Sequence, residues 1–188
     1  MSKPETKNEE IKQLVLTTDP DNVSQELLNQ FAGITSLDLS YSDFENIDIL
    51  VNFPNLTHLD LGGCDALENL DIVSSLINLT SLNLACCSKL QDLGGLASLT
   101  NLTSLDLSSC ESLQNIESIV ALPNLNKLII ATAYDQKKSI QLPDLIDQCV
   151  NLEHLDLSGY DFTLPSGLGR LTRLKIFSLG SNNRSCYK

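Results

Sequence analysis

Leucine recurs through this chain at a spacing that fits neither one long helix nor an ordinary strand. In residues 78–100, NLTSLNLACCSKLQDLGGLASLT, an LxxLxL stretch is followed by CxxL and by further leucines at every third position. Aligning the LxxLxL stretches gives eight units, 22 or 23 residues apart except for one interval of 27. The units begin at Ile11, Ile34, Leu56, Leu79, Leu102, Leu125, Leu152 and Leu174. A repeat of this length predicts an array of stacked units rather than a conventional globular core.

Each unit has two halves with different periods. The xLxL half alternates and predicts a short strand, whereas the LxxLxxL half predicts a turn or short helix that returns the chain. One strand per unit, stacked on the next, predicts a parallel sheet of about eight strands. No unit can bury its apolar side alone, so neighbouring units supply the core.

The pattern resembles the leucine-rich repeat family at six positions of one unit: Leu82, Leu84, Cys87, Leu90, Leu93 and Leu96. The ending LGGLASLTNLTSL resembles the short repeats of bacterial internalin-like proteins, and CxxL at 64–67, 87–90 and 110–113 resembles the cysteine-containing type. The resemblance implies an α/β fold, a curved right-handed solenoid. Its parallel sheet would line the concave face and its short helices or turns the convex face. Such proteins usually use the concave face to hold another protein.

The sequence predicts one domain. Residues 1–10 are interpreted as a polar tail and 11–188 as the repeat domain, with the first repeat, 11–33, as a helical N-terminal cap. The cap is expected because TTDPDNVSQELLNQF replaces the short return, with Thr18 or Asp19 before Pro20 as a helix-start signal.

Other units depart from the pattern in ways that predict local structure. Phe44 and Phe162 replace the CxxL stretch in two units and are expected to fill their coils. The 27-residue unit leaves room for a loop around Lys137 and Lys138 and a helix starting near Pro143.

Charge and composition exclude several classes of function. Twelve Lys and Arg against twenty-four Asp and Glu give a formal charge of −12, which disfavours nucleic acid and anionic lipid and favours a basic protein partner. The start MSKPETKNEE lacks the apolar segment of a signal peptide, and no apolar run is long enough to span a bilayer. We expect a monomer located in the cytoplasm, or in host cytosol if the protein is a translocated bacterial effector.

The six cysteines are predicted to be free thiols, because a chain without an export signal meets a reducing compartment. Cys64, Cys87 and Cys110 share one repeat position and should form an inward ladder. Ser42, Tyr160 and Asn182 hold the same position in other units. Packing is the favoured role over a metal site, since no His or carboxylate joins the motif, and no cofactor is expected.

The side chains predicted to point outward from the strands form the candidate binding site. Asp38, Asp60, Asp106 and Asp156 share the fifth repeat position, where Asn83 fills a gap, and are interpreted as an acidic row. His58 and His154 share the third position but lie four strands apart, roughly 19 Å at the usual strand spacing, so one metal ion cannot bind both. Lys127, Ile129 and Ile176 complete the proposed protein-binding surface, with the two isoleucines as an apolar patch.

Catalytic motifs are absent from the sequence: it contains no phosphate-binding loop, GxSxG, HExxH or CxxC. Recurrent Asn-Leu-Thr at 55, 78 and 101 follows from the repeat and carries no glycosylation meaning without secretion. The sequence therefore predicts a non-catalytic protein-binding module, with an effector acting on a host protein as the leading form. The alternatives are a cytosolic adaptor, such as a phosphatase regulator or ubiquitin-ligase substrate receptor, and, remotely, an enzyme that uses concave carboxylates.

Overall fold

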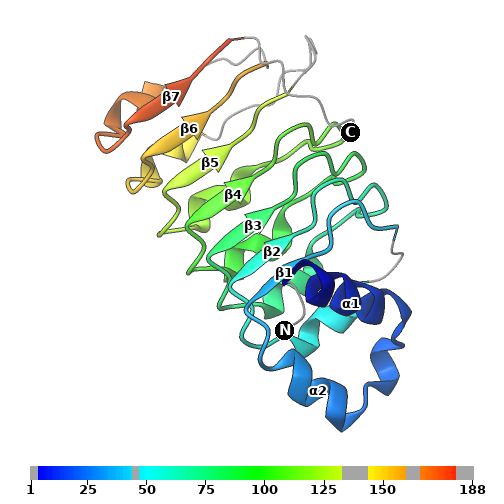
Figure 1. Cartoon of the computed structure of the whole chain (residues 1–188). Coiled ribbons are helices and arrows are strands. Elements are labelled where there is room, and N and C mark those ends of the chain that lie inside the picture. Colours follow the sequence, from blue (N-terminus) through cyan, green and yellow to red (C-terminus); the bar gives the residue numbers. More distant parts are fainter. Residues whose placement is uncertain (1–3, 44–46, 133–143, 160–165, 181–188) are drawn as a thin grey trace.

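The structure is a computed structural model that describes residues 4–43, 47–132, 144–159 and 166–180. Within them, seven strands form one parallel sheet in which strand order follows chain order (Figure 1). The strands are β1 Ser36–Asp38, β2 His58–Asp60, β3 Ser81–Asn83, β4 Ser104–Asp106, β5 Lys127–Ile129, β6 His154–Asp156 and β7 Ile176–Ser178. Each strand pairs in register with the next, so that Leu37, Leu59 and Leu82 lie side by side. The predicted stack of one-strand coils is confirmed.

The core runs through the inside of the coils. In the LxxLxL stretch of the third strand, Leu79, Leu82 and Leu84 are all buried, and Cys87, Leu90 and Leu93 follow them into the core. The pattern holds from coil to coil until β7, where Phe177 and Leu179 occupy the inward positions but are about half exposed. These two side chains have only one described neighbouring coil to pack against.

Short 3-10 helices return the chain on the side of each coil opposite the strands (Figure 1). They are η2 Asp48–Asn52, η3 Asp71–Ser75, η4 Gly94–Ser98, η5 Glu117–Ala121, η6 Asp144–Gln148 and η7 Ser166–Arg170. Their bonds span three residues, as from the Val73 N–H to the Leu70 carbonyl at 3.0 Å. The tighter 3-10 turn suits a coil that must reverse direction within a few residues. The helix expected near Pro143 is η6, whereas Lys137, Lys138, Phe44 and Phe162 lie outside the described residues.

Residues 4–31 form helices and contain no strand, so the structure describes seven strands where the sequence predicts about eight. Helix α1 spans Pro4–Thr17, η1 spans Pro20–Asn22 and α2 spans Gln25–Phe31. The boundary predicted between residues 10 and 11 therefore falls inside α1. Ile11 and Leu14 pack on the core and Val15 is buried in it. LxxLxL would require Ile11, Leu14 and Leu16 to point inward, but Leu16 is 36% exposed and Val15 is buried instead, which is the i, i+3, i+4 spacing of one face of a helix.

The helix-start signal before Pro20 is confirmed for the short η1. The Asp19 side chain accepts the Asp21 N–H at 3.0 Å. Ser24 caps α2 in the same way, and α2 delivers Phe31 into the core, where its ring stacks on Phe53 with centroids 4.3 Å apart. Aromatic stacking thus joins the helical N-terminal region to the first coil of the sheet.

The predicted cysteine ladder is confirmed. The thiols of Cys64, Cys87 and Cys110 are buried and donate to the carbonyls of Leu39, Leu61 and Leu84 at 3.4, 3.2 and 3.1 Å. Burial raises the pKa of Cys64 to about 11 and that of Cys87 to about 12. The pKa of Cys110 rises for the same reason. These thiols are packing groups that bond the backbone of the preceding coil.

Cys86 corrects the prediction that all six cysteines are free, because it is disulfide-bonded. Cys64, Cys87, Cys110 and Cys149 are free and buried, whereas Cys186 lies outside the described residues. Cys86 differs from its neighbour Cys87 because it is only half-buried and its backbone is left-handed, with φ 62°. Its side chain therefore does not belong to the inward ladder.

Replacing Gly95 with alanine is expected to lower the free energy of unfolding by about 1–3 kcal/mol. A Cβ at Gly95 would lie 1.9 Å from the Leu70 carbonyl oxygen of the preceding coil, so the backbone of one coil must move. Urea denaturation of the variant measures the loss.

Gly169 provides the matched control, because a Cβ there meets nothing within 4 Å. Ala97 already holds the equivalent position in η4. Gly169→Ala should change the free energy of unfolding by about 0.5 kcal/mol or less. Equal losses in the two alanine variants would contradict close packing of η4 on the coil before it.

Candidate functional site: the concave face

Strand register arranges the outward side chains in two rows across the sheet. The first row consists of Ser36, His58, Ser81, Ser104, Lys127, His154 and Ile176. The second consists of Asp38, Asp60, Asn83, Asp106, Ile129, Asp156 and Ser178. His58 and His154 lie on β2 and β6, so the structure does not bring the two histidines together.

The acids of the second row have a structural role that the sequence reading missed. In five coils, the Asp or Asn side chain accepts the backbone N–H two residues later, at 2.8 to 3.0 Å. The residues are Asp38, Asp60, Asn83, Asp106 and Asp156. This bond closes the turn after each strand, which explains why Asp or Asn recurs there. Recognition of a partner is not needed to account for the row.

Asp60 and Asn83 also bond to each other across neighbouring strands. The Asn83 amide nitrogen lies 3.0 Å from both carboxylate oxygens of Asp60. Asn83 thus separates Asp60 from Asp106 and donates to the former. Both acids remain half-exposed, so they still contribute negative charge to this surface.

Two predicted site residues are buried, which corrects their assignment to an exposed surface. Ile129 is only 4% exposed and Asp156 only 3%. The Asp156 Oδ1 accepts both the N–H and the hydroxyl of Ser158, which holds the carboxylate against its own turn. Beside them Ala131 and Thr132 are buried as well, so Ile129 belongs to a packed region and not to an open apolar patch. Ile176, in contrast, is 52% exposed on β7.

Tyr41 is an exposed aromatic residue that the sequence reading missed. It follows β1 in the left-handed region, with φ 53°, and is 58% exposed. Its ring lies over Gly63 of the next coil, where a Cβ would come within 2.5 Å of the ring. The signal in the sequence is a tyrosine at a repeat position that elsewhere holds Gly, Cys, Ser or Thr. Tyr41 thus stands exposed on the turn that follows β1, against the next coil.

Comparison with known proteins identifies the architecture. Residues 54–72, 75–97 and 98–115 match the family described as Leucine Rich repeat. The chain has the leucine-rich repeat fold. Leucine-rich repeat solenoids are typical protein-interaction modules, whose stacked repeats create an extended concave surface. No curated protein is significantly similar to this chain in sequence.

Solved leucine-rich repeat structures resemble the chain over most of its length. Internalin C2 of Listeria monocytogenes is 21% identical with a TM-score of 0.53, over 81% of this chain and 83% of the internalin. The leucine-rich repeat domain of the type III effector XopL is 19% identical with a TM-score of 0.68, over 92% of this chain and 64% of that domain. A chain of the mouse RP105/MD-1 complex is 26% identical with a TM-score of 0.65, over 78% of this chain but only 26% of that one.

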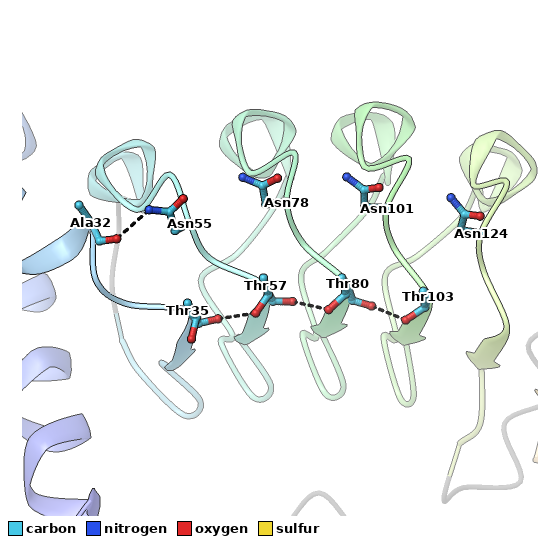
Figure 2. A pocket seen from close by; sticks show the side chains of 9 residues that line it. All are labelled: Ala32, Thr35, Asn55, Thr57, Asn78, Thr80, Asn101, Thr103 and Asn124. Carbon is cyan, nitrogen blue, oxygen red and sulfur yellow. Dashed lines mark hydrogen bonds between the residues drawn. The ribbon is translucent and has the colours of Figure 1, made fainter.

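A groove of about 820 Å³ runs along the side of the leucine-rich repeat solenoid, between strands and 3-10 helices (Figure 2). Two rows of side chains line it: Asn55, Asn78, Asn101 and Asn124, and Thr35, Thr57, Thr80 and Thr103. Each asparagine donates to a carbonyl of the preceding coil at 2.8 to 3.0 Å. Each threonine after Thr35 donates its hydroxyl to the preceding threonine carbonyl at 2.9 to 3.0 Å. The rows therefore fasten each repeat to the one before it.

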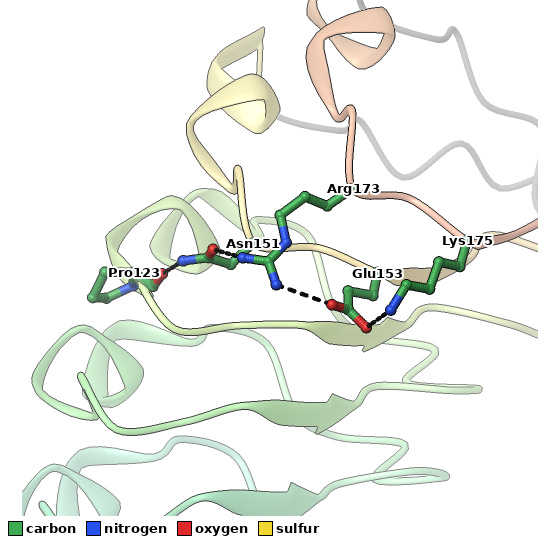
Figure 3. Close-up of polar contacts among 5 residues, drawn as sticks. All are labelled: Pro123, Asn151, Glu153, Arg173 and Lys175. Carbon is green, nitrogen blue, oxygen red and sulfur yellow. Dashed lines mark hydrogen bonds and ion pairs between the residues drawn. The ribbon is translucent and has the colours of Figure 1, made fainter.

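Beyond the groove, the asparagine row ends in a charged network (Figure 3). Asn151 donates to the Pro123 carbonyl at 2.7 Å and accepts from the Arg173 guanidinium at 2.8 Å. Arg173 and Lys175 both pair with Glu153, at 3.0 and 2.8 Å. Hydrogen bonds from Lys175 and then Arg173 lower the pKa of the Glu153 carboxyl.

Metal and membrane sites do not emerge from the described part of the chain. Its His, Cys, Asp and Glu side chains form no group of three or more suited to a metal ion. Its helices include none that is long and apolar enough to cross a membrane.

Proposed function

We propose that the chain is a non-catalytic module that binds a partner protein on its concave face. The observation that best supports this is the exposed Tyr41 ring, which stands on the turn after β1 and lies over Gly63 of the next coil. Tyrosine is enriched among the residues that dominate binding energy, because it offers a large rigid surface with a polar end. Tyr41 replaces the buried Ile129 as the proposed apolar anchor.

The proposed partner has a basic surface. The formal charge of −12 attracts cations over the whole molecule, and Asp60 and Asp106 place part of it on the concave face. His58, Asn83, Lys127 and His154 would contribute polar contacts, and Ile176 an apolar contact at the far end. Asp156 is buried, whereas Asp38 is exposed and Asp60 and Asp106 are half-exposed, so we assign charge recognition to these three acids.

The proposed biological role is that of a bacterial effector acting on a host protein in host cytosol, as a monomer. Support comes from the fold shared with internalin C2 and with the type III effector XopL. The disulfide at Cys86 is more typical of oxidising compartments. A translocation reporter fused to the chain would separate an effector from a cytosolic adaptor, such as a phosphatase regulator or ubiquitin-ligase substrate receptor.

An enzyme that uses the concave carboxylates is the weakest alternative. Asp60 accepts bonds from the Gly62 N–H and the Asn83 amide, which leaves it poorly suited to proton transfer. A turnover screen with the purified chain tests this alternative.

Two variants are expected to weaken binding in different ways. Asp60→Asn/Asp106→Asn removes charge but keeps the turn bond, as Asn83 demonstrates, so association should slow roughly threefold and depend less on salt. Tyr41→Asn keeps a residue that tolerates left-handed backbone but removes the ring, so dissociation should accelerate roughly tenfold. Capture from host-cell lysate identifies the partner, and stopped-flow kinetics with the purified partner measure both effects.

Asp65→Asn is the matched control. Asp65 carries the same charge outside the concave rows, where it accepts the Ser88 hydroxyl at 2.7 Å. Its loss should leave both rates unchanged within about twofold. If the concave variants bind like the parent while changes within residues 133–148 abolish binding, the site lies in the long sixth repeat instead.

A further inference from the structure

The asparagine amides along the lateral groove have a fixed orientation. Because each amide nitrogen donates to the coil before it, the amide oxygen must face the coil after it, as Figure 2 shows for Asn78 and Asn101. An amide oxygen carries two lone pairs. Among the described residues, no donor bonds the side-chain oxygens of Asn55, Asn78, Asn101 or Asn124. The groove therefore presents a row of exposed acceptors, one per coil.

Arg173 indicates which kind of group these acceptors suit. It holds the same repeat position as the asparagines, one coil after Asn151. Its guanidinium donates through Nη1 to the Asn151 oxygen and through Nη2 to Glu153, which stands at the threonine position (Figure 3). One planar guanidinium thus reaches from the asparagine row to the neighbouring row.

The open part of the groove keeps this arrangement with threonine in place of glutamate. The hydroxyls of Thr57, Thr80 and Thr103 each donate their proton to a backbone carbonyl. Toward the groove, these hydroxyls can therefore only accept hydrogen bonds, as the asparagine oxygens do. No lysine or arginine lines the groove. Both walls are therefore matched to a group that only donates, and the formal charge of −12 favours a cationic one.

We propose that the lateral groove is a second docking site, which takes arginine side chains from a basic segment of a partner protein. Each guanidinium would donate to an asparagine oxygen on one wall and a threonine oxygen on the other. Arginine fits better than lysine because its planar guanidinium can donate hydrogen bonds to both walls at once, whereas the lysine ammonium is a compact point charge. The groove acceptors are neutral, so a single arginine should bind weakly, with a Kd on the order of millimolar. The site is separate from the concave face and does not depend on the function proposed there.

Side-chain amide signals of the uniformly ¹⁵N-labelled full chain provide a direct test by NMR. Titration with N-acetyl-arginine amide should shift the Asn78 and Asn101 side-chain NH₂ signals in a saturable way. N-acetyl-lysine amide at equal ionic strength should produce shifts smaller by about threefold or more. Equal shifts with the two probes would mean that only general charge attraction operates, and would overturn the proposal.

Arg173→Ala adds a gain-of-binding test. Arg173 is 57% exposed, so its removal should not unfold the chain. It frees the Asn151 oxygen and Glu153 Oε1, while Lys175 stays bonded to Oε2. The Asn151 amide should then respond to N-acetyl-arginine amide at several-fold lower concentration than Asn78, because a carboxylate oxygen strengthens the site. A response at Asn151 alone, with Asn78 and Asn101 silent, would assign binding to Glu153 and overturn the proposal. Asp60→Asn/Asp106→Asn should leave the Asn78 and Asn101 responses unchanged.

Discussion

Replacing Leu84 with alanine is expected to lower the free energy of unfolding by about 2–5 kcal/mol. Leu84 is fully buried, and its backbone N–H bonds the Asp106 carbonyl of the next coil at 2.9 Å. Truncation removes apolar contacts from one coil and leaves a cavity that its neighbours also line, because each repeat depends on the next for its core. Urea denaturation monitored by circular dichroism measures the loss.

Ile77→Ala is the control for this change. Ile77 is 58% exposed on the outer side of the coil, so alanine there should cost about 0.5 kcal/mol or less. A loss well under 1 kcal/mol for Leu84→Ala, or equal losses for the two variants, would contradict the inward register of the leucines.

The sheet could be predicted from the sequence because two periods occur together: alternation within each strand and the 22–23-residue repeat between strands. Alternation within xLxL assigns Leu82 and Leu84 to one side, and the 22–23-residue repeat places equivalent residues on neighbouring strands. The same pattern failed at Ile11, Leu14 and Leu16, which fit LxxLxL but lie in helix α1, where Val15 is buried in place of Leu16. The first coil has no preceding strand to pair with, and a helix satisfies its own backbone hydrogen bonds.

The candidate site was less predictable than the sheet. Strand register determines on which face of the sheet a side chain lies, but it does not determine whether that side chain is exposed to solvent. Ile129 and Asp106 are neighbours in the same row, yet Ile129 is buried and Asp106 half-exposed. Local chemistry adds a second role to the row. The turn bond of Asp60 by itself explains an acid at that position, so the recurrence of Asp does not by itself indicate recognition. Whether a side chain bonds its own turn or remains available to a partner protein depends on distances between atoms. A repeat pattern does not contain these distances.

The lateral groove depends on a recurrent asparagine that is visible in the sequence, although its structural role is not. Asparagine precedes the first leucine of five successive units, at Asn55, Asn78, Asn101, Asn124 and Asn151. Three of these begin Asn-Leu-Thr triplets, which have the form of glycosylation sites. Their shared role depends on a carbonyl in the preceding coil, 23 to 28 residues away, which becomes a neighbour only once the solenoid forms.

Stability should fall steeply above pH 9, because four thiols are buried in the folded chain. Burial raises the pKa of Cys64 and Cys149 to about 11 and that of Cys87 to about 12, and it raises the pKa of Cys110 as well. In the unfolded chain these thiols ionise near pH 9, so between pH 9 and 11 the unfolded state holds fewer protons than the folded state. The free energy of unfolding then decreases as pH rises, by about 1.4 kcal/mol per pH unit for each thiol. Below pH 8 the thiols are protonated in both states and this dependence vanishes.

Cys110→Ser isolates the thiol contribution from the lysines and tyrosines that titrate in the same range. Serine does not ionise there, and its hydroxyl can donate to the Leu84 carbonyl as the thiol does. A buried serine, Ser42, already occupies the equivalent position in the first coil of the sheet. Urea denaturation at intervals from pH 7.5 to 10.5, with a reductant present, should give parallel curves below pH 8 and, above pH 9, a slope for the variant that is shallower than that of the parent by about 1.4 kcal/mol per pH unit. Parallel curves above pH 9 would show that Cys110 ionises as readily in the folded chain as in the unfolded one, which its complete burial in the ladder forbids.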